Sequence, residues 1–172
     1  RRELNPETVM KNVKEVLREA GENCPEKIEA MAVTSLGESV VCLDKEGRVL
    51  ANSMLTGDPR GIEEIKEIIE TMGDQKIFEI TGLPPNELYG LPKYMWLNRN
   101  TDAVKRAEAI LFYEDFVGYM LTGQRKVSYS SAARSMAFDI RKMEWSKELL
   151  KLAGIRAEQM SEPVKPCTVI GA

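Results

Sequence analysis

Histidine is absent from this 172-residue sequence, and cysteine occurs only three times, with no C-x-x-C pair. The cysteines are Cys24, Cys42 and Cys167. The lack of imidazole excludes histidine-based catalysis and most zinc sites, because such zinc sites are built largely from cysteine and histidine. We therefore expect no metal site in this chain, and we interpret the cysteines as small apolar side chains in a protein of the reducing cytoplasm.

A surplus of basic residues and a long apolar run are also missing. The formal net charge is −3 and the sequence pI is about 5.3, which is not the electrostatic footprint of a nucleic-acid-binding protein. No apolar run approaches the roughly 20 residues of a membrane-spanning helix, and we see no signal peptide at the start. The composition, 43% hydrophobic and 30% charged, is typical of a soluble protein, and the length favours one domain.

The first half of the chain alternates between helical periodicity and short apolar runs. Apolar residues at spacings of three and four predict amphipathic helices, and short apolar runs bounded by turn residues predict strands. The predicted elements are a helix over residues 6–20 with no strand before it, a buried central strand over 28–34, a hairpin over 40–51 with its turn at 44–47, and a helix over 62–72.

The second half continues this alternation, which predicts an α/β domain. Proline at a first helical position and a polar residue just before a helix mark where helices begin. The predicted elements are a short helix and an irregular connection over 74–90, a helix from Pro92 that carries Trp96, a short helix capped by residues 100–102, and a strand over 109–112.

Residues 114–154 carry the most distinctive pattern of the sequence. A helix ends at Gly123, a Ser/Ala-rich segment and an apolar run over 136–138 follow, and a second helix runs from Ser146 to Gly154. The segments L-T-G, Y-S-x-A-x-R-S, F-D-I and W-S-x-E-L-L-x-x-x-G-I occur in this order within about forty residues. This order resembles the N-terminal domain of the FGGY family of carbohydrate kinases. The segments AVTSLGESVVCLDKEGRVLANSMLTGDPRG, LPKYMWL and PVKPCTVIG resemble further parts of it.

The resemblance implies a ribonuclease H-like, actin-like fold, with residues 1–172 forming part of the N-terminal, sugar-binding domain. In this family ATP and sugar bind in the cleft between two such domains. The glycine-rich phosphate-binding hairpin and the aspartate base of the family are not found in the sequence, so we expect a domain incomplete at its N-terminal hairpin. Catalytic, nucleotide-binding and metal-binding residues are then expected outside this chain, with ATP and Mg²⁺ bound by the full-length parent. The isolated chain is expected to be inactive.

Three positions depart from the family pattern. Leu36 stands where the family often has glutamine, Thr56 replaces the tryptophan of W-x-D-x-R, and Ser128 replaces the aspartate before Y-S-x-A. In the family, an aromatic ring in the W-x-D-x-R loop commonly packs against the sugar. Because Thr56 stands at that position here, the resemblance does not identify the particular sugar.

The resemblance places five candidate substrate-binding residues in loops. Glu38 follows Gly37, whose missing side chain lets a ligand approach closely, and its carboxylate can accept hydrogen bonds from sugar hydroxyls. Asp58 and Arg60 flank a proline and resemble the acid and base of the W-x-D-x-R loop. Tyr89 lies near another substrate contact of the family, although Leu88 is an alternative counterpart. The residue types alone favour solvated loops and a helix-capping Asp58.

Other conspicuous side chains are expected to be structural. Trp96 and Trp145 are interpreted as core anchors, and Arg134 as a bridge between segments of the domain. Asp115 is expected to be an acid at a helix N-terminus. Asp139 is expected to form a turn.

Two functions from different classes follow. The first is a fragment of an ATP-dependent carbohydrate kinase that phosphorylates a sugar or polyol hydroxyl. The second is a non-catalytic, actin-like binding or regulatory module. With either function, we expect the chain to self-associate through an exposed sheet edge. We expect neither nucleic acid nor a membrane as a partner.

Overall fold

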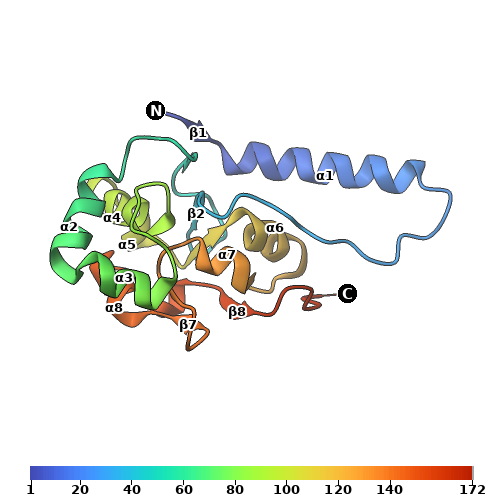
Figure 1. The fold of residues 1–172 in the computed structure, drawn as a ribbon. Helices are drawn as coiled ribbons and strands as arrows, with labels where there is room; N and C mark the ends of the chain where they lie inside the picture. The colour runs from blue at the N-terminus through green and yellow to red at the C-terminus, as the bar shows by residue number, and fades with distance from the viewer. Residues whose placement is uncertain (172) are drawn as a thin grey trace.

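The computed structural model describes residues 1–171 as short strand pairs set among helices (Figure 1). The helices are α1 (Pro6–Asn23), α2 (Ile62–Met72), α3 (Asp74–Thr81), α4 (Gly90–Asn100), α5 (Ala103–Arg106), α6 (Tyr113–Thr122), α7 (Tyr129–Ala133), α8 (Lys147–Leu152) and the 3-10 turn η1 (Ala157–Gln159). The strands are β1 (Glu3–Leu4), β2 (Val40–Leu43), β3 (Ser53–Met54), β4 (Ala109–Phe112), β5 (Lys126–Ser128), β6 (Phe138–Asp139), β7 (Glu144–Trp145) and β8 (Glu162–Val164). Among the helices described, none is long and apolar enough to cross a membrane.

The antiparallel pair β2–β4 forms the centre of the core, with Val40 opposite Phe112 and Leu43 opposite Ala109. All eight residues of this pair are at most 4% exposed. Alternate side chains enter two apolar clusters, one with α4 and α5 and the other with α1 and α6, and Figure 1 shows α4 and α6 on opposite sides of β2. Both faces of the pair are therefore covered, which explains why its strands are apolar at every position rather than at alternate ones.

The ends of α2 and α6 agree with the glycine stops that the sequence predicts, whereas α1 continues through Gly21 to Asn23, beyond its predicted end at residue 20. Gly73 and Gly123 follow α2 and α6 at φ values of 78° and 74°, in the region that favours glycine, and the N–H of each donates to the carbonyl oxygen four residues earlier, at 2.8 Å. Ser146 caps α8 through its side chain, as expected, and the predicted strand over 109–112 is β4. These elements are confirmed because their signals are local.

Two expectations for the N-terminal part are wrong. A strand does precede the first helix, since β1 pairs with β3 through Glu3 and Met54. The predicted central strand over 28–34 has no regular structure, and Ile28 and Met31 are about half exposed (52% and 51%). Within the described residues no strand lies alongside this segment, and without a partner its N–H and C=O groups cannot form a ladder. Figure 1 shows α1 extending from the body, with this connection running back from its far end.

The predicted hairpin is confirmed at its turn and at one antiparallel bridge beside it. The N–H of Gly47 donates to the carbonyl oxygen of Asp44 at 2.9 Å, but the returning arm makes only the single bridge from Val49 to Leu43. β2 pairs with β4 instead, a partner more than sixty residues further along the chain. The apolar run over 136–138 gives only the short strand β6, because Met136 has a positive φ of 58° that interrupts extended backbone.

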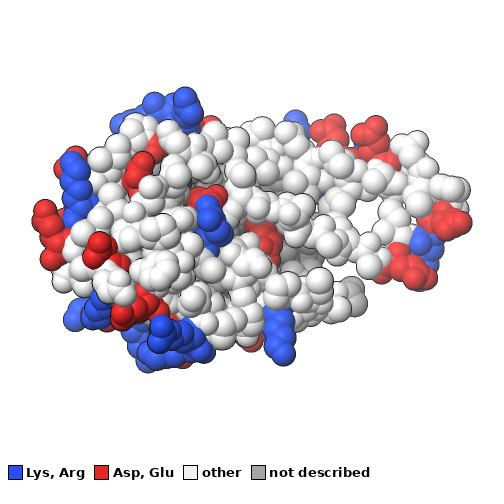
Figure 2. All heavy atoms as spheres, in the orientation of Figure 1, with Lys and Arg blue, Asp and Glu red and all other residues white. Residues whose placement is uncertain are grey.

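Figure 2 shows acidic and basic side chains next to one another on the visible face, mainly along its rim. The charged groups form local ion pairs such as Lys126 with Glu162 at 2.8 Å and Arg99 with Glu67 at 2.7 Å. This mixed surface agrees with the small net charge.

Candidate functional site

The Y-S-x-A-x-R-S segment folds into α7 and positions Arg134 at its C-terminal end. Ser128 caps the helix by accepting a hydrogen bond from the N–H of Ser131 at 3.2 Å. The carboxylate of Glu114 in α6 accepts from the N–H and the hydroxyl of Ser128, at 3.0 and 2.9 Å, and also from the hydroxyl of Ser131. Because both ends of this contact lie on regular elements, the backbone that carries Arg134 is held firmly against α6.

Arg134 forms an ion pair with Glu38, 96 residues earlier in the chain. Its Nε donates to Oε1 of Glu38 at 2.7 Å, and its Nη2 donates to the same oxygen. The side chain of Glu38 is only 10% exposed, whereas that of Arg134 is 45% exposed. Within residues 1–171, Oε2 of Glu38 accepts no hydrogen bond, so one carboxylate oxygen is held and the other has acceptor capacity left.

Tyr89 and Gly37 lie against the same arginine. The guanidinium carbon of Arg134 lies 4.9 Å from the centre of the Tyr89 ring, a cation–π contact. A Cβ atom at position 37 would lie 2.7 and 2.8 Å from Cβ and Cγ of Arg134, too close for any side chain. Three of the five predicted residues, Gly37, Glu38 and Tyr89, are therefore brought together by Arg134, and these contacts confirm the predicted bridge between segments of the domain.

Asp58 and Arg60 form a separate, closed arrangement. Asp58 is 1% exposed and accepts four hydrogen bonds, from the N–H of Arg2 at 2.6 Å and from Arg60 through its N–H at 3.1 Å, Nε at 2.7 Å and Nη2 at 2.8 Å. These bonds, above all those from Arg60, hold the pKa of Asp58 well below its usual range. A hydroxyl could bond to Asp58 only by displacing one of them. The geometry favours a loop-holding role, while substrate contact by Asp58 and Arg60 stays a prediction.

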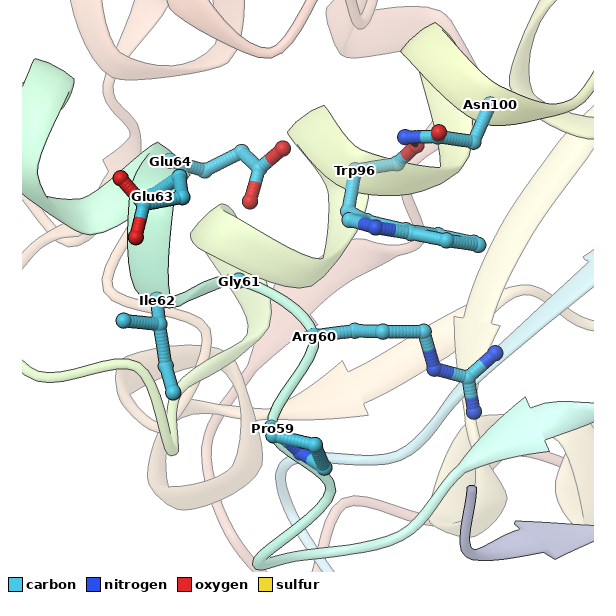
Figure 3. A pocket seen from close by; sticks show the side chains of 8 residues that line it. All are labelled: Pro59, Arg60, Gly61, Ile62, Glu63, Glu64, Trp96 and Asn100. Atoms are coloured by element: carbon cyan, nitrogen blue, oxygen red, sulfur yellow. Dashed lines mark hydrogen bonds between the residues drawn. The ribbon is translucent and has the colours of Figure 1, made fainter.

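Arg60 also contacts Glu3 near the N-terminus and Trp96 in α4. Its Nη1 lies 2.8 Å from Oε1 of Glu3, and its guanidinium carbon lies 5.1 Å from the centre of the Trp96 ring. Figure 3 shows the guanidinium beneath this ring, at one side of an open hollow between the start of α2 and α4. The hollow has a volume of about 440 Å³ and is lined by Pro59, Arg60, Gly61, Ile62, Glu63, Glu64, Trp96 and Asn100.

The two tryptophans differ in environment. Trp145 is 8% exposed, and its indole N–H donates to the carbonyl oxygen of Ser161 at 2.7 Å, which confirms the expected core anchor. Trp96 packs against the core but is only partly buried, so the expectation of a core anchor is met only in part.

Lys93 is a buried cation that the sequence analysis did not single out. It is 0% exposed, and its Nζ lies 3.5 Å from the carbonyl oxygen of Glu38. Burial lowers the pKa of Lys93, and the nearby carboxylates of Glu38 and Asp58 oppose that shift. Its ammonium group thus connects the two loops electrostatically. The signal available in the sequence was a lysine within the apolar segment LPKYMWL, where burial requires nearby negative charge.

Two further acids have structural partners. Asp115 lies in the first turn of α6, where it accepts hydrogen bonds from the N–H of Phe112 at 2.8 Å and from the hydroxyl of Ser161 at 2.6 Å. It lies at a helix N-terminus as expected, but it is also buried, and burial raises its pKa to about 7. Asp139 accepts from the N–H groups of Arg141 and Lys142, both at 3.0 Å, which confirms a turn-forming role. Residues 1–171 contain no group of three or more acidic, cysteine or histidine side chains arranged to hold a metal ion.

The architecture is shared with solved carbohydrate kinases of the actin-like, ribonuclease H-like class. Xylulose kinase from Rhodospirillum rubrum superposes with a TM-score of 0.92 over 99% of this chain and 36% of that chain, at 25% identity. Gluconate kinase from Lactobacillus acidophilus gives a TM-score of 0.89 over 98% of this chain and 34% of that chain, at 24% identity. The fold class expected from the sequence is therefore confirmed.

The FGGY family of carbohydrate kinases, N-terminal domain, matches residues 1–172, and the chain belongs to this family. It is 33% identical over 161 residues to a glycerol kinase of Thermococcus gammatolerans, covering 89% of this chain and 32% of the relative. It is 28% identical over 163 residues to the autoinducer-2 kinase of Escherichia coli K12, covering 91% and 31%. The chain thus spans about a third of the length of the curated relatives it matches.

Proposed function

We propose that this chain forms the sugar-binding part of an ATP-dependent kinase that phosphorylates a hydroxyl of a sugar or polyol, and that Glu38 contacts this substrate. The observation that supports the proposal is the Glu38 carboxylate, with Oε1 held by Arg134 and Oε2 without a partner among the described residues. Membership of the FGGY family supports the class of reaction.

The chemistry of the site suits a ligand rich in hydroxyl groups. A hydroxyl that donates to Oε2 forms a charge-assisted hydrogen bond, which is roughly twice as strong as a bond between neutral groups. The charges of Glu38 and Arg134 balance, so a neutral substrate needs no further counter-charge there. We propose that Asp58 and Arg60 support the loop beside this site, because all four strong bonds of Asp58 are already made.

ATP and Mg²⁺ enter the proposal only as partners of the whole kinase. Phosphoryl transfer depends mainly on positioning and on neutralising charge on the transferred group. The described residues offer no cluster of metal ligands, so we assign no step through Mg²⁺ to this chain. Its own contribution is to bind the acceptor and to hold the reacting hydroxyl in a fixed direction.

The test is a steady-state kinase assay of the complete protein with ATP and a panel of glycerol, xylulose, gluconate and other sugars and polyols. Glu38→Gln keeps the shape of the side chain and removes its charge, so kcat/KM for the accepted substrate should fall about ten- to a hundredfold, with the KM for ATP unchanged. Glu158→Gln, at an exposed glutamate, is the matched control and should have no effect. A folded, nucleotide-binding protein that phosphorylates no member of a broad panel would instead favour a binding or regulatory module.

A further inference from the structure

We propose that Arg134 is a positioning residue for substrate binding, which turns the free oxygen of Glu38 toward the substrate and selects a ligand with two neighbouring oxygen groups. This inference rests on the proposed function of Glu38. The two are separable by experiment, because Glu38→Gln weakens the contact through Oε2, whereas Arg134 both orients that oxygen and offers Nη1 to a second oxygen of the ligand.

The first support is the way the ion pair is made. Nε and Nη2 of Arg134 both donate to Oε1 of Glu38, whereas a side-by-side pair would use one nitrogen for each oxygen. Two donors on one oxygen fix the direction of the carboxylate and leave Oε2 on the other side. In a purely structural ion pair, engaging both oxygens would give the stronger contact.

The second support is the rigidity of the arginine itself. Its guanidinium lies over the ring of Tyr89 at 4.9 Å, and its backbone ends a helix capped by Ser128. The next residue, Ser135, accepts a hydrogen bond through its carbonyl oxygen from the N–H of Leu91 in α4, at 2.7 Å. A long side chain that is 45% exposed is normally mobile, and these contacts restrict it.

The third support is Gly37. Because a Cβ atom there would lie 2.7 Å from Cβ of Arg134, the residue before Glu38 must be glycine for the arginine to pass. The space beside Glu38 is thus reserved for the arginine side chain. The ion pair and the neighbouring glycine depend on each other.

The nitrogen of Arg134 that does not contact Glu38 suggests the class of ligand. Nη1 of Arg134 makes no hydrogen bond to any residue between 1 and 171, and the side chain is partly exposed. A substrate hydroxyl can therefore donate to Oε2 of Glu38 while the neighbouring oxygen accepts from Nη1. This pair of contacts fits a neutral vicinal diol, a unit shared by polyols and sugars.

The experiment compares variants of the complete kinase in steady-state assays with both substrates varied. Arg134→Met should lower kcat/KM for the polyol or sugar about ten- to a hundredfold and leave the KM for ATP within about twofold. Arg134→Lys should recover part of this loss, because it keeps the charge and loses the planar fork. Arg48→Met, at an arginine paired with Asp44 and Glu46 on the hairpin turn, is the control and should match the unaltered enzyme.

Variants at Tyr89 test the cation–π contact that holds Arg134, and they leave the charges of Arg134 and Glu38 unchanged. Tyr89→Leu removes the ring and should lower kcat/KM for the sugar or polyol about two- to tenfold, and Tyr89→Phe, which keeps the ring, should lower it less than Tyr89→Leu does. Gly37→Ala should reproduce the kinetic defect of Arg134→Met, because the added methyl group displaces the arginine. If Arg134→Met lowers only the melting temperature and leaves kcat/KM of the folded enzyme unchanged, the inference is wrong.

Combining the Glu38 and Arg134 variants separates this inference from the proposed function. If Arg134 acts through Glu38, Arg134→Met should lower kcat/KM for the sugar or polyol less in the Glu38→Gln enzyme than it does in the unaltered enzyme. Full additivity of the two defects would overturn the positioning role. A normal KM and kcat in Glu38→Gln would instead remove the proposed contact itself.

Discussion

Replacing Asp58 by asparagine keeps the shape of a buried side chain and removes its charge, which separates a structural role from substrate contact. The asparagine oxygen can still accept from the N–H and Nε of Arg60. Its amide nitrogen, however, would face the N–H of Arg2 and Nη2 of Arg60, both of which are donors. Two of the four hydrogen bonds are therefore lost and replaced by repulsive contacts.

The expected loss of stability follows from these contacts. Breaking a buried ion pair by altering one partner typically costs about 3–5 kcal/mol. Arg60 retains its contact with Glu3 at 2.8 Å, so the lower end, about 3 kcal/mol, applies. For a chain of this length each kcal/mol shifts Tm by roughly 2–4 °C, so Tm should fall by about 6–12 °C. The control Asp102→Asn removes one exposed contact with Arg106 and should change Tm by no more than about 2 °C.

The pH dependence gives a second, independent readout. The pKa of Asp58 is lower in the folded protein than in the unfolded chain, so its stabilising contribution is present above the unfolded pKa of about 4 and is lost as the pH falls below it. The Tm difference between the original protein and Asp58→Asn should stay constant from pH 5 to 8 and shrink below pH 4. Circular dichroism melting curves measure both effects.

One pair of results would refute this reasoning. If Asp58→Asn melts within 2 °C of the original protein while kcat/KM for the sugar falls tenfold or more in the complete kinase, Asp58 contacts the substrate. The closed hydrogen-bond arrangement would then have to open when the substrate binds.

Three further predictions concern other parts of the chain. Burial raises the pKa of Asp115 to about 7, so the free energy of unfolding should fall as pH rises from about 4 to 7. In denaturant titrations, Asp115→Asn should remove this dependence, up to about 4 kcal/mol; a parallel pH profile in the variant would contradict it. The 172-residue polypeptide should show no Mg²⁺-dependent, micromolar ATP binding by calorimetry, because its sequence has no glycine-rich loop to present N–H groups to phosphates. It should self-associate at tens of micromolar in sedimentation runs, since residues 28–36, which form no strand, expose Ile28, Met31 and Leu36; a monomer alone would count against this.

Local chemistry in the sequence was enough to predict most helices and their ends. Glycines at positive φ close α2 and α6, and Ser146 caps α8, because these signals act within one turn of helix. The order of motifs over residues 114–154 was enough to predict the family, and the TM-scores confirm its fold. The sequence also indicated that a group approaches Gly37, beside Glu38, and the structure shows that this group is the side chain of Arg134.

The tertiary structure decided which strands pair and which side chains meet. β2 pairs over its whole length with β4 and meets the arm after its own turn at only one bridge, and residues 28–34 form no strand, because strand pairing depends on partners far away in the chain. Arg134 meets Glu38 across 96 residues, and the N–H of Arg2 meets Asp58 across 56. No local pattern encodes such contacts. They arise when packing brings distant loops together, which leaves the carboxylate of Asp58 fully bonded and one oxygen of Glu38 free.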